Sequence, residues 1–126
     1  MITGPSGRVY DPLPIDNTAG LPQQFPLALN GVNYQFQLYV DVPEAALGPI
    51  DEVMVLPDPQ RFMVARVDIL AADGTTQTIF LRKVVPSLEY NVRGIALYFP
   101  TQLVARRNLN GVGSFGSNIV GGVALL

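Results

Sequence analysis

Hydrophobic and polar residues alternate along two long stretches of the chain, which is the pattern of β-strands with one buried face. Between residues 32 and 41 the even-numbered residues are apolar or aromatic, and the odd-numbered ones are Asn, Gln or Asp except for Tyr39. Asn30-Gly31 precedes this stretch. It is the preferred dipeptide of a two-residue hairpin turn, because both positions need a positive φ. The pattern therefore predicts a hairpin whose first strand begins at Phe25.

The second alternating stretch covers residues 61–70. Its apolar positions recur at every second residue: Met63, Ala65, Val67 and Ile69. We expect these side chains to face inward, so that Arg66 and Asp68 point outward together. Asp73-Gly74 then supplies a tight turn, and the β-branched residues of 75–85 predict the partner strand of a second hairpin.

The C-terminal third predicts two further strands. Residues 93–99 are expected to form a strand that Pro100 stops, and residues 101–107 are compatible with either a helix or a strand. Residues 108–126 contain five glycines and predict a long loop followed by a short closing strand that starts at Val120 or Val123. About six to eight short strands separated by turns indicate an all-β fold, either a small antiparallel β-barrel or a sandwich.

Proline is concentrated at the N-terminus and in one internal connection. Residues 1–26 contain five of the eleven prolines, which excludes a helix and a central strand. We predict an extended proline-rich N-terminal arm at residues 1–24 and an all-β domain at residues 25–126 that folds without it. The arm is expected to lie along its own domain or along a neighbouring protein.

Residues 43–60 contain four more prolines and form a long connection. A single helical turn at residues 44–47 and a short strand at residues 53–56 are expected within it. Connections of this length in compact domains are usually functional or packed on a partner.

The composition is apolar and poor in charge. Hydrophobic residues make up 48% and charged residues 14% of the chain, whereas about 25% charged residues is typical of soluble domains. Such a surface is typical of a subunit that is covered by neighbouring proteins.

The charge and hydropathy patterns also argue against nucleic-acid and membrane partners. The net charge is −2 and the basic residues are scattered, so no phosphate-binding stripe is expected. No segment approaches the roughly 18 apolar residues of a membrane span. The first residues lack the features of a signal peptide. We expect a soluble chain that is made in a cytoplasm.

The side chains that most enzymes need are scarce. Histidine and cysteine are absent, which removes the commonest general base, the best nucleophile and the commonest metal ligands. The carboxylate pairs Asp41/Glu44 and Asp51/Glu52 fall at loop edges, and the acidic residues at 51, 52 and 58 match no calcium motif. The glycine-rich segment 111–116 follows no parallel strand and opens no helix, so it is not expected to bind phosphate. We expect no catalysis, no cofactor and no metal.

Six residues are candidates for contact with a partner protein: Tyr39, Arg106, Arg107, Pro12, Pro14 and Pro49. Tyr39 is an aromatic side chain on the polar face of its predicted strand. The two arginines are of the type that often anchors interfaces. The prolines belong to the arm and to the long connection. An alternative is that Tyr39 and Tyr90 stack on sugar rings, whereas Tyr34 is expected in the core.

Two segments resemble a known family. Residues 25–38 read FPLALNGVNYQFQL and residues 67–74 read VDILAADG. They are similar to the small baseplate plug proteins of contractile-tailed phages, which have an F-x-L-x-L-x-G-x-x-Y-x-L-x-L hairpin and a later strand that ends D-I-x-D-x-x-G. The similarity covers residues 25–41 and 61–75. The chain departs from the family in lacking tryptophan and in its long 43–60 connection.

The resemblance implies a structural virion protein of a phage tail or baseplate that binds other virion proteins and has no catalytic residues. We expect it to form a homo-oligomer within the particle and to contact neither nucleic acid nor membrane. A capsid decoration protein is the alternative within the virion. A carbohydrate-binding module for host recognition is the alternative of another class.

Overall fold

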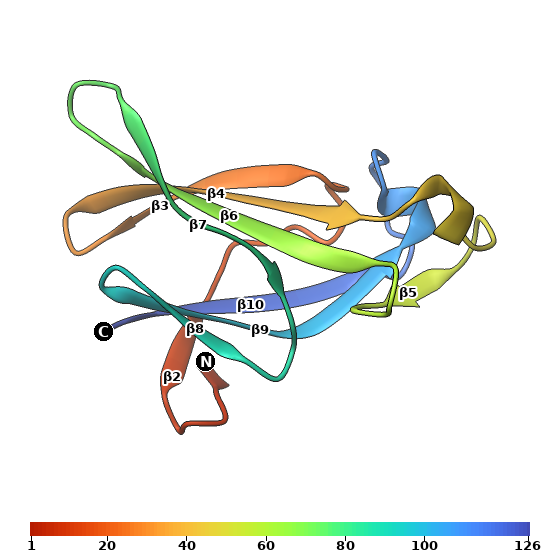
Figure 1. The fold of residues 1–126 in the computed structure, drawn as a ribbon, viewed down its shortest axis with the longest axis horizontal. Helices are drawn as coiled ribbons and strands as arrows, with labels where there is room; N and C mark the ends of the chain where they lie inside the picture. The colour runs from red at the N-terminus through yellow and green to blue at the C-terminus, as the bar shows by residue number, and fades with distance from the viewer.

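Two antiparallel β-sheets face each other and form a two-layer sandwich (Figure 1). The structure is a computed structural model that describes residues 1–126. The four-stranded sheet has the order β3-β4-β6-β7. Its strands are β3 (Gln23–Leu29), β4 (Val32–Asp41), β6 (Phe62–Leu70) and β7 (Thr76–Val84). The all-β fold class is therefore confirmed.

The six-stranded sheet has the order β1-β2-β10-β9, with β5 and β8 both paired to the far side of β9. Its strands are β1 (Ile2–Thr3), β2 (Val9–Pro12), β5 (Val53–Val55), β8 (Glu89–Val92), β9 (Ile95–Ala105) and β10 (Asn118–Leu125). Two short 3-10 helices complete the structure: η1 (Glu44–Ala46) and η2 (Arg106–Asn108). Neither helix is long enough to cross a membrane.

Both hairpins predicted from the alternating pattern are present. Asn30 and Gly31 have φ values of 49° and 79° and join β3 to β4. Phe36 and Leu38 of β4 are completely buried, and the Phe36 ring stacks on that of Phe25 with 5.4 Å between centroids. In β6 the predicted inward residues pack in the core. Arg66 and Asp68 point outward together, with 3.1 Å between Nε and Oδ1.

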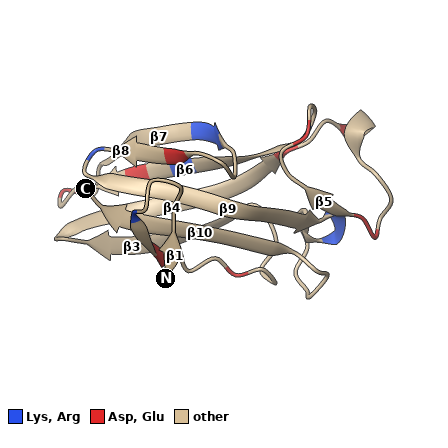
Figure 2. Ribbon diagram, turned by 90° about the horizontal axis from the view of Figure 1, so that it is seen from below, with Lys and Arg blue, Asp and Glu red and all other residues tan.

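The hydrophobic core lies between the sheets and takes side chains from both of them. Its largest completely buried members come from β4, β6 and β9 as well as from β5 and β7: Phe36, Phe99, Leu38, Met54, Met63, Ile95, Leu97, Val67 and Val84. Charged residues are spread thinly over the two sheets (Figure 2). The sandwich is thus held together mainly by apolar contacts.

The N-terminal segment is extended and lies along its own domain, which is one of the two surfaces expected for it. Strand β2 pairs with β10 through Pro12 and Gly122. Tyr10 is completely buried, and a Cβ on Gly122 would lie 2.6 Å from the Cβ of Tyr10. Leu13 and Leu21 also belong to the core. The boundary expected after residue 24 falls inside β3, so residues 1–24 and 25–126 share one core.

Strand β9 differs from the expectation, because it continues through Pro100 to Ala105. On the β10 side the register shifts between Val120 and Gly122. On the other side the pairing with β8 ends at Tyr98, and the pairing with β5 begins at Leu103. Pro100 therefore lies at an irregularity of the ladder, where a missing N–H interrupts no regular pairing.

Candidate functional site

A hollow of about 780 Å³ opens at one end of the sandwich, where β4 runs into the 43–60 connection. Figure 1 shows this end at the right, opposite the tips of the β3–β4 and β6–β7 hairpins. The hollow is lined by residues of four segments: Leu21, Pro22, Tyr39, Val40, Val42, Glu44, Leu47, Ile50, Arg106, Arg107, Leu109, Asn110, Gly111, Val112 and Phe115. Most of these side chains are apolar.

One wall of the hollow is the first part of the 43–60 connection. It includes the expected helical turn, here the 3-10 helix η1, and ends where β5 pairs with β9. The backbone N–H of Arg106 donates to the carbonyl of Glu52 at 2.9 Å, and the Arg106 guanidinium donates to the carbonyl of Gly48. These bonds fix the connection to the start of η2.

Ion pairs hold the second half of the same connection. The Arg61 guanidinium lies 2.8 Å from Glu52 Oε1 and 2.6 Å from Asp58 Oδ2. Hydrogen bonds from the Gln60 backbone, and next from the Arg61 side chain, lower the pKa of Asp58 below its ordinary value. The connection is thus tied at both ends, which positions Leu47 and Ile50 at the hollow.

The opposite wall is the loop that follows η2, and Asn108 organises it. Asn108 is buried, and its amide donates to the carbonyls of Gly111 and Gly113 at 3.2 and 3.0 Å. Its Oδ1 accepts a hydrogen bond from the Ser117 hydroxyl at 2.7 Å. The glycine-rich segment therefore turns two carbonyls toward an amide, whereas a phosphate site needs converging N–H groups.

Large apolar side chains are exposed on the rim of the hollow. Ile50 is 56% exposed, Val112 79% and Phe115 38%. Water-exposed apolar groups beside an apolar hollow lose unfavourable hydration when another molecule covers them. The rim therefore favours contact with a partner.

The hollow also carries two arginines that form no ion pair. The three ion pairs of the structure are Arg61 with Glu52, Arg61 with Asp58, and Arg66 with Asp68. Neither Arg106 nor Arg107 takes part in one. The Arg107 guanidinium lies over the Phe115 ring, 5.7 Å from its centroid, which orients the charge at the rim. Glu44 is the one carboxylate of the lining.

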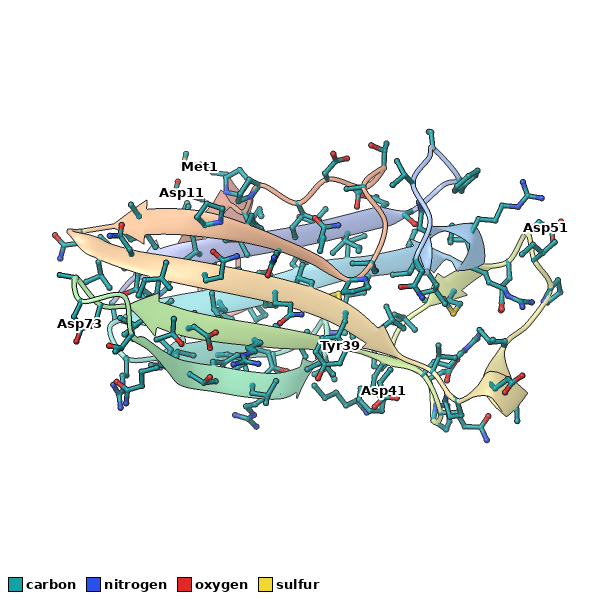
Figure 3. All side chains as sticks on the ribbon, turned by 90° about the horizontal axis from the view of Figure 1, so that it is seen from above. Met1, Asp11, Tyr39, Asp41, Asp51 and Asp73 are labelled. Atoms are coloured by element: carbon teal, nitrogen blue, oxygen red, sulfur yellow. The ribbon has the colours of Figure 1, made fainter.

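Three of the six candidate contact residues come together here, namely Tyr39, Arg106 and Arg107. Figure 3 shows Tyr39 and Asp41 on the half of β4 that leads to this end. Pro49 is exposed in the same connection, next to Ile50 but outside the lining. Pro12 and Pro14 are exposed in the N-terminal segment and do not line the hollow.

Sequence reasoning missed the apolar residues of the rim. Ile50 follows Gly48-Pro49, and Val112 lies between two glycines, so both stand in segments that have no periodic pattern. One signal could have identified them. Each is a large apolar side chain that stands alone in a segment rich in glycine or proline.

The structure brings no group of three or more acidic side chains close enough to share a metal ion. Of the acidic pairs considered from the sequence, Glu52 is bonded to Arg61, and Asp51 lies at the tip of the molecule (Figure 3). Tyr34 is in the core, as predicted. Tyr90 is buried as well, and its hydroxyl accepts a hydrogen bond from the Val85 N–H, so its ring is closed to a sugar.

Comparison of the chain with protein-family models, with curated proteins and with solved structures found no match.

Proposed function

We propose that the chain is a structural subunit that binds other proteins through the hollow end of its sandwich, in the tail or baseplate of a phage particle. The observation that carries the docking function is the combination of the 780 Å³ hollow with the exposed rim of Ile50, Val112 and Phe115. Exposed apolar patches of this kind mark interaction sites in soluble proteins.

The side chains of the hollow support a binding role over catalysis. Glu44 is its single carboxylate, and the chain has no imidazole or thiol to act with it. Acid–base and nucleophilic mechanisms usually place a second titratable or nucleophilic group within reach of the first. Arginine, tyrosine and apolar side chains are instead the usual anchors of protein interfaces.

The virion setting rests on the resemblance of residues 25–38 and 67–74 to baseplate plug proteins. In the structure these segments correspond to the β3–β4 hairpin and the end of β6 with its turn. The low charge content is the second support, because a poorly charged surface suits a subunit with many neighbours.

The test is incorporation of a tagged chain into phage particles. Ile50→Asp combined with Val112→Asp places charges on the rim and leaves the core untouched. We expect at least about a tenfold loss of incorporation, which corresponds to about 1.4 kcal/mol of binding free energy. Leu81→Asp combined with Leu88→Asp is the matched control, since these residues are 53% and 51% exposed and lie outside the hollow.

Immunoblots of purified particles measure incorporation, and immunogold electron microscopy measures position. Label at the tail tip supports the proposal, and label on the head favours a capsid decoration protein. Rim variants that enter particles as well as the wild type would contradict docking through the hollow.

A further inference from the structure

Strand β4 is longer than its neighbour β3 at the hollow end of the sheet. The β3–β4 pairing ends at Gln23 with Leu38, whereas the β4–β6 pairing continues to Asp41 with Phe62. The last three residues of β4, from Tyr39 to Asp41, thus have a strand neighbour on one side only. The position beside them is a vacant strand position within the sheet.

The chain that would fill this position is held elsewhere. The N–H of Leu21 donates to the carbonyl of Asn108, and the N–H of Asn110 donates to the carbonyl of Leu21, both at 2.7 Å. Leu21 therefore pairs with the far wall of the hollow. Leu21, Pro22, Tyr39 and Val40 all line the hollow, so the vacant position opens into it.

The geometry of the hairpin identifies the free backbone groups. Leu29 and Val32 flank the two-residue turn and form a directly opposed pair. In such a hairpin that pair exchanges hydrogen bonds, and every second residue of β4 then directs its N–H and C=O toward β3. Counting from Val32, these residues include Val40, which lies beyond the last paired residue of β3. One donor and one acceptor of β4 thus face the vacant position.

We propose that the hollow binds an extended segment of a neighbouring protein, which adds to β4 at Val40 as a short strand and carries both apolar and acidic side chains. The apolar side chains cover Leu47, Ile50 and Val112, and a carboxylate pairs with Arg106 or Arg107. Strand addition supplies backbone hydrogen bonds, while side-chain pockets supply specificity. This inference rests on the proposed docking function and names the chemistry of the partner.

Charge complementarity with the two arginines favours an acidic residue in the bound segment. Arg106 and Arg107 have no carboxylate partner in the chain, and both are held in place, Arg106 by the Gly48 carbonyl and Arg107 by the Phe115 ring. A guanidinium that is fixed in advance loses less conformational freedom when it pairs with a carboxylate. Basic or purely apolar segments leave these two charges covered and unpaired, which is unfavourable.

Selection from a random-peptide display library on the full-length chain tests the inference. We expect enriched peptides with Asp or Glu next to apolar residues. Arg107→Ala should raise the Kd of a selected peptide about 10- to 100-fold, the range expected for a hydrogen-bonded charge. Arg82→Ala is the matched control, because Arg82 is also an exposed arginine over an aromatic ring, that of Tyr90, and lies outside the hollow. Near-UV circular dichroism verifies that each variant is folded.

Methylation of one backbone nitrogen at a time in a selected peptide tests strand addition. Affinity should fall mainly at one position, because the carbonyl of Val40 is the one β4 acceptor that faces the added strand. Equal effects at all positions, or none, would overturn strand addition.

Three further outcomes overturn the inference. Enriched peptides that lack acidic residues, or that bind Arg107→Ala as tightly as the wild type, would contradict the acidic partner segment. Either result would leave the proposed docking through the hollow standing. A library that yields no binder contradicts the peptide partner, and the particle test then decides docking independently. Self-association in sedimentation experiments that Ile50→Asp abolishes would make a second copy of the chain the occupant.

Discussion

Glu89 connects the N-terminal segment to strand β8. Its carboxylate accepts hydrogen bonds from the Tyr10 hydroxyl at 2.6 Å and from the N–H and hydroxyl of Ser6, both at 2.8 Å. The bond from Tyr10, followed by those from Ser6, lowers the pKa of Glu89 below its ordinary value. Burial, and next the bond to Glu89, raises the pKa of Tyr10, so the phenol remains a donor. The pair holds β1 and β2 against β8.

Because of this contact, we expect the stability of the fold to fall as the pH is lowered through the acid range. The folded-state pKa of Glu89 lies below its unfolded value, so its contribution to stability is complete above the unfolded pKa. The contribution is lost as the pH falls below about 4, through the folded pKa. We expect the Tm of the wild type to fall more steeply than that of Glu89→Gln between about pH 5 and pH 2, as measured by circular dichroism.

Other lowered carboxyls, Asp16, Asp58 and Asp73, titrate in the same window in both proteins. The difference between the two curves therefore isolates Glu89. Parallel curves would show that its hydrogen bonds contribute no pH-dependent stability.

At the level of elements, the sequence predicts the strands whose signals are local. Alternation and the Asn30-Gly31 turn are enough to predict β3 and β4, and the inward residues of β6 follow in the same way. These elements are hairpins, in which each strand has its partner next to it in the sequence. Their register is fixed by the turn and by the buried face.

The strands that were missed lack a clear local pattern. β2 pairs with β10, at the other end of the chain, whereas β8 pairs with the adjacent β9 but is too short to show alternation. Pro100 predicts the end of a strand, whereas the register shift that accommodates this proline lies in β10 and leaves no signal near residue 100. Tertiary pairing decided β2 and the course of β9 beyond Pro100, and single-sequence patterns do not contain it.

The candidate site, too, could be predicted from the sequence only in part. Tyr39 was accessible to sequence reasoning because it is an aromatic residue on the polar face of its strand, and Arg106 and Arg107 because arginine often anchors interfaces. The hollow itself arises only when the 43–60 connection is folded against η2, through the bonds of Arg106 to Glu52 and Gly48.

The 43–60 connection leads to the next prediction. Arg61→Ala removes the ion pairs to Glu52 and Asp58, which tie the connection together beside β6. We expect several-fold faster amide hydrogen exchange over residues 50–60 and weaker peptide binding at the hollow, with only a small loss of Tm. Hydrogen exchange with mass spectrometry measures the first effect.

Arg66→Ala is the control, because it removes an ion pair on the exposed face of β6 and leaves the connection untouched. Unchanged exchange in Arg61→Ala would mean that backbone bonds alone hold the connection.

Over the whole molecule, binding and structural roles are separated along the long axis. The hollow and its rim occupy one end, and Asp73 marks the hairpin tip at the other (Figure 3). Between them, one core joins the two sheets and includes Leu13 and Leu21. The docking end is thus carried by a scaffold in which the N-terminal segment takes part.

From this arrangement we predict that residues 25–126 do not fold alone, in contrast to the expectation from the sequence. Truncating a buried leucine to alanine costs about 2–5 kcal/mol, whereas the net stability of a domain is about 5–15 kcal/mol. Deletion of residues 1–24 removes Leu13, Leu21 and the buried Tyr10 together, and it exposes the edge of β10. We expect the shortened chain to lack a cooperative melting transition and native near-UV circular dichroism.

Deletion of residues 1–8 is the matched control. It removes β1 and the Ser6 bonds to Glu89 but leaves β2, Leu13 and Leu21 in place. This chain should melt cooperatively at a lower Tm than the full-length protein, because only peripheral contacts are lost. A chain of residues 25–126 that melts like the full-length protein would show that the first 24 residues are an accessory arm. The buried positions of Tyr10, Leu13 and Leu21 would then contribute little to folding, and the core of the two sheets would be complete without them.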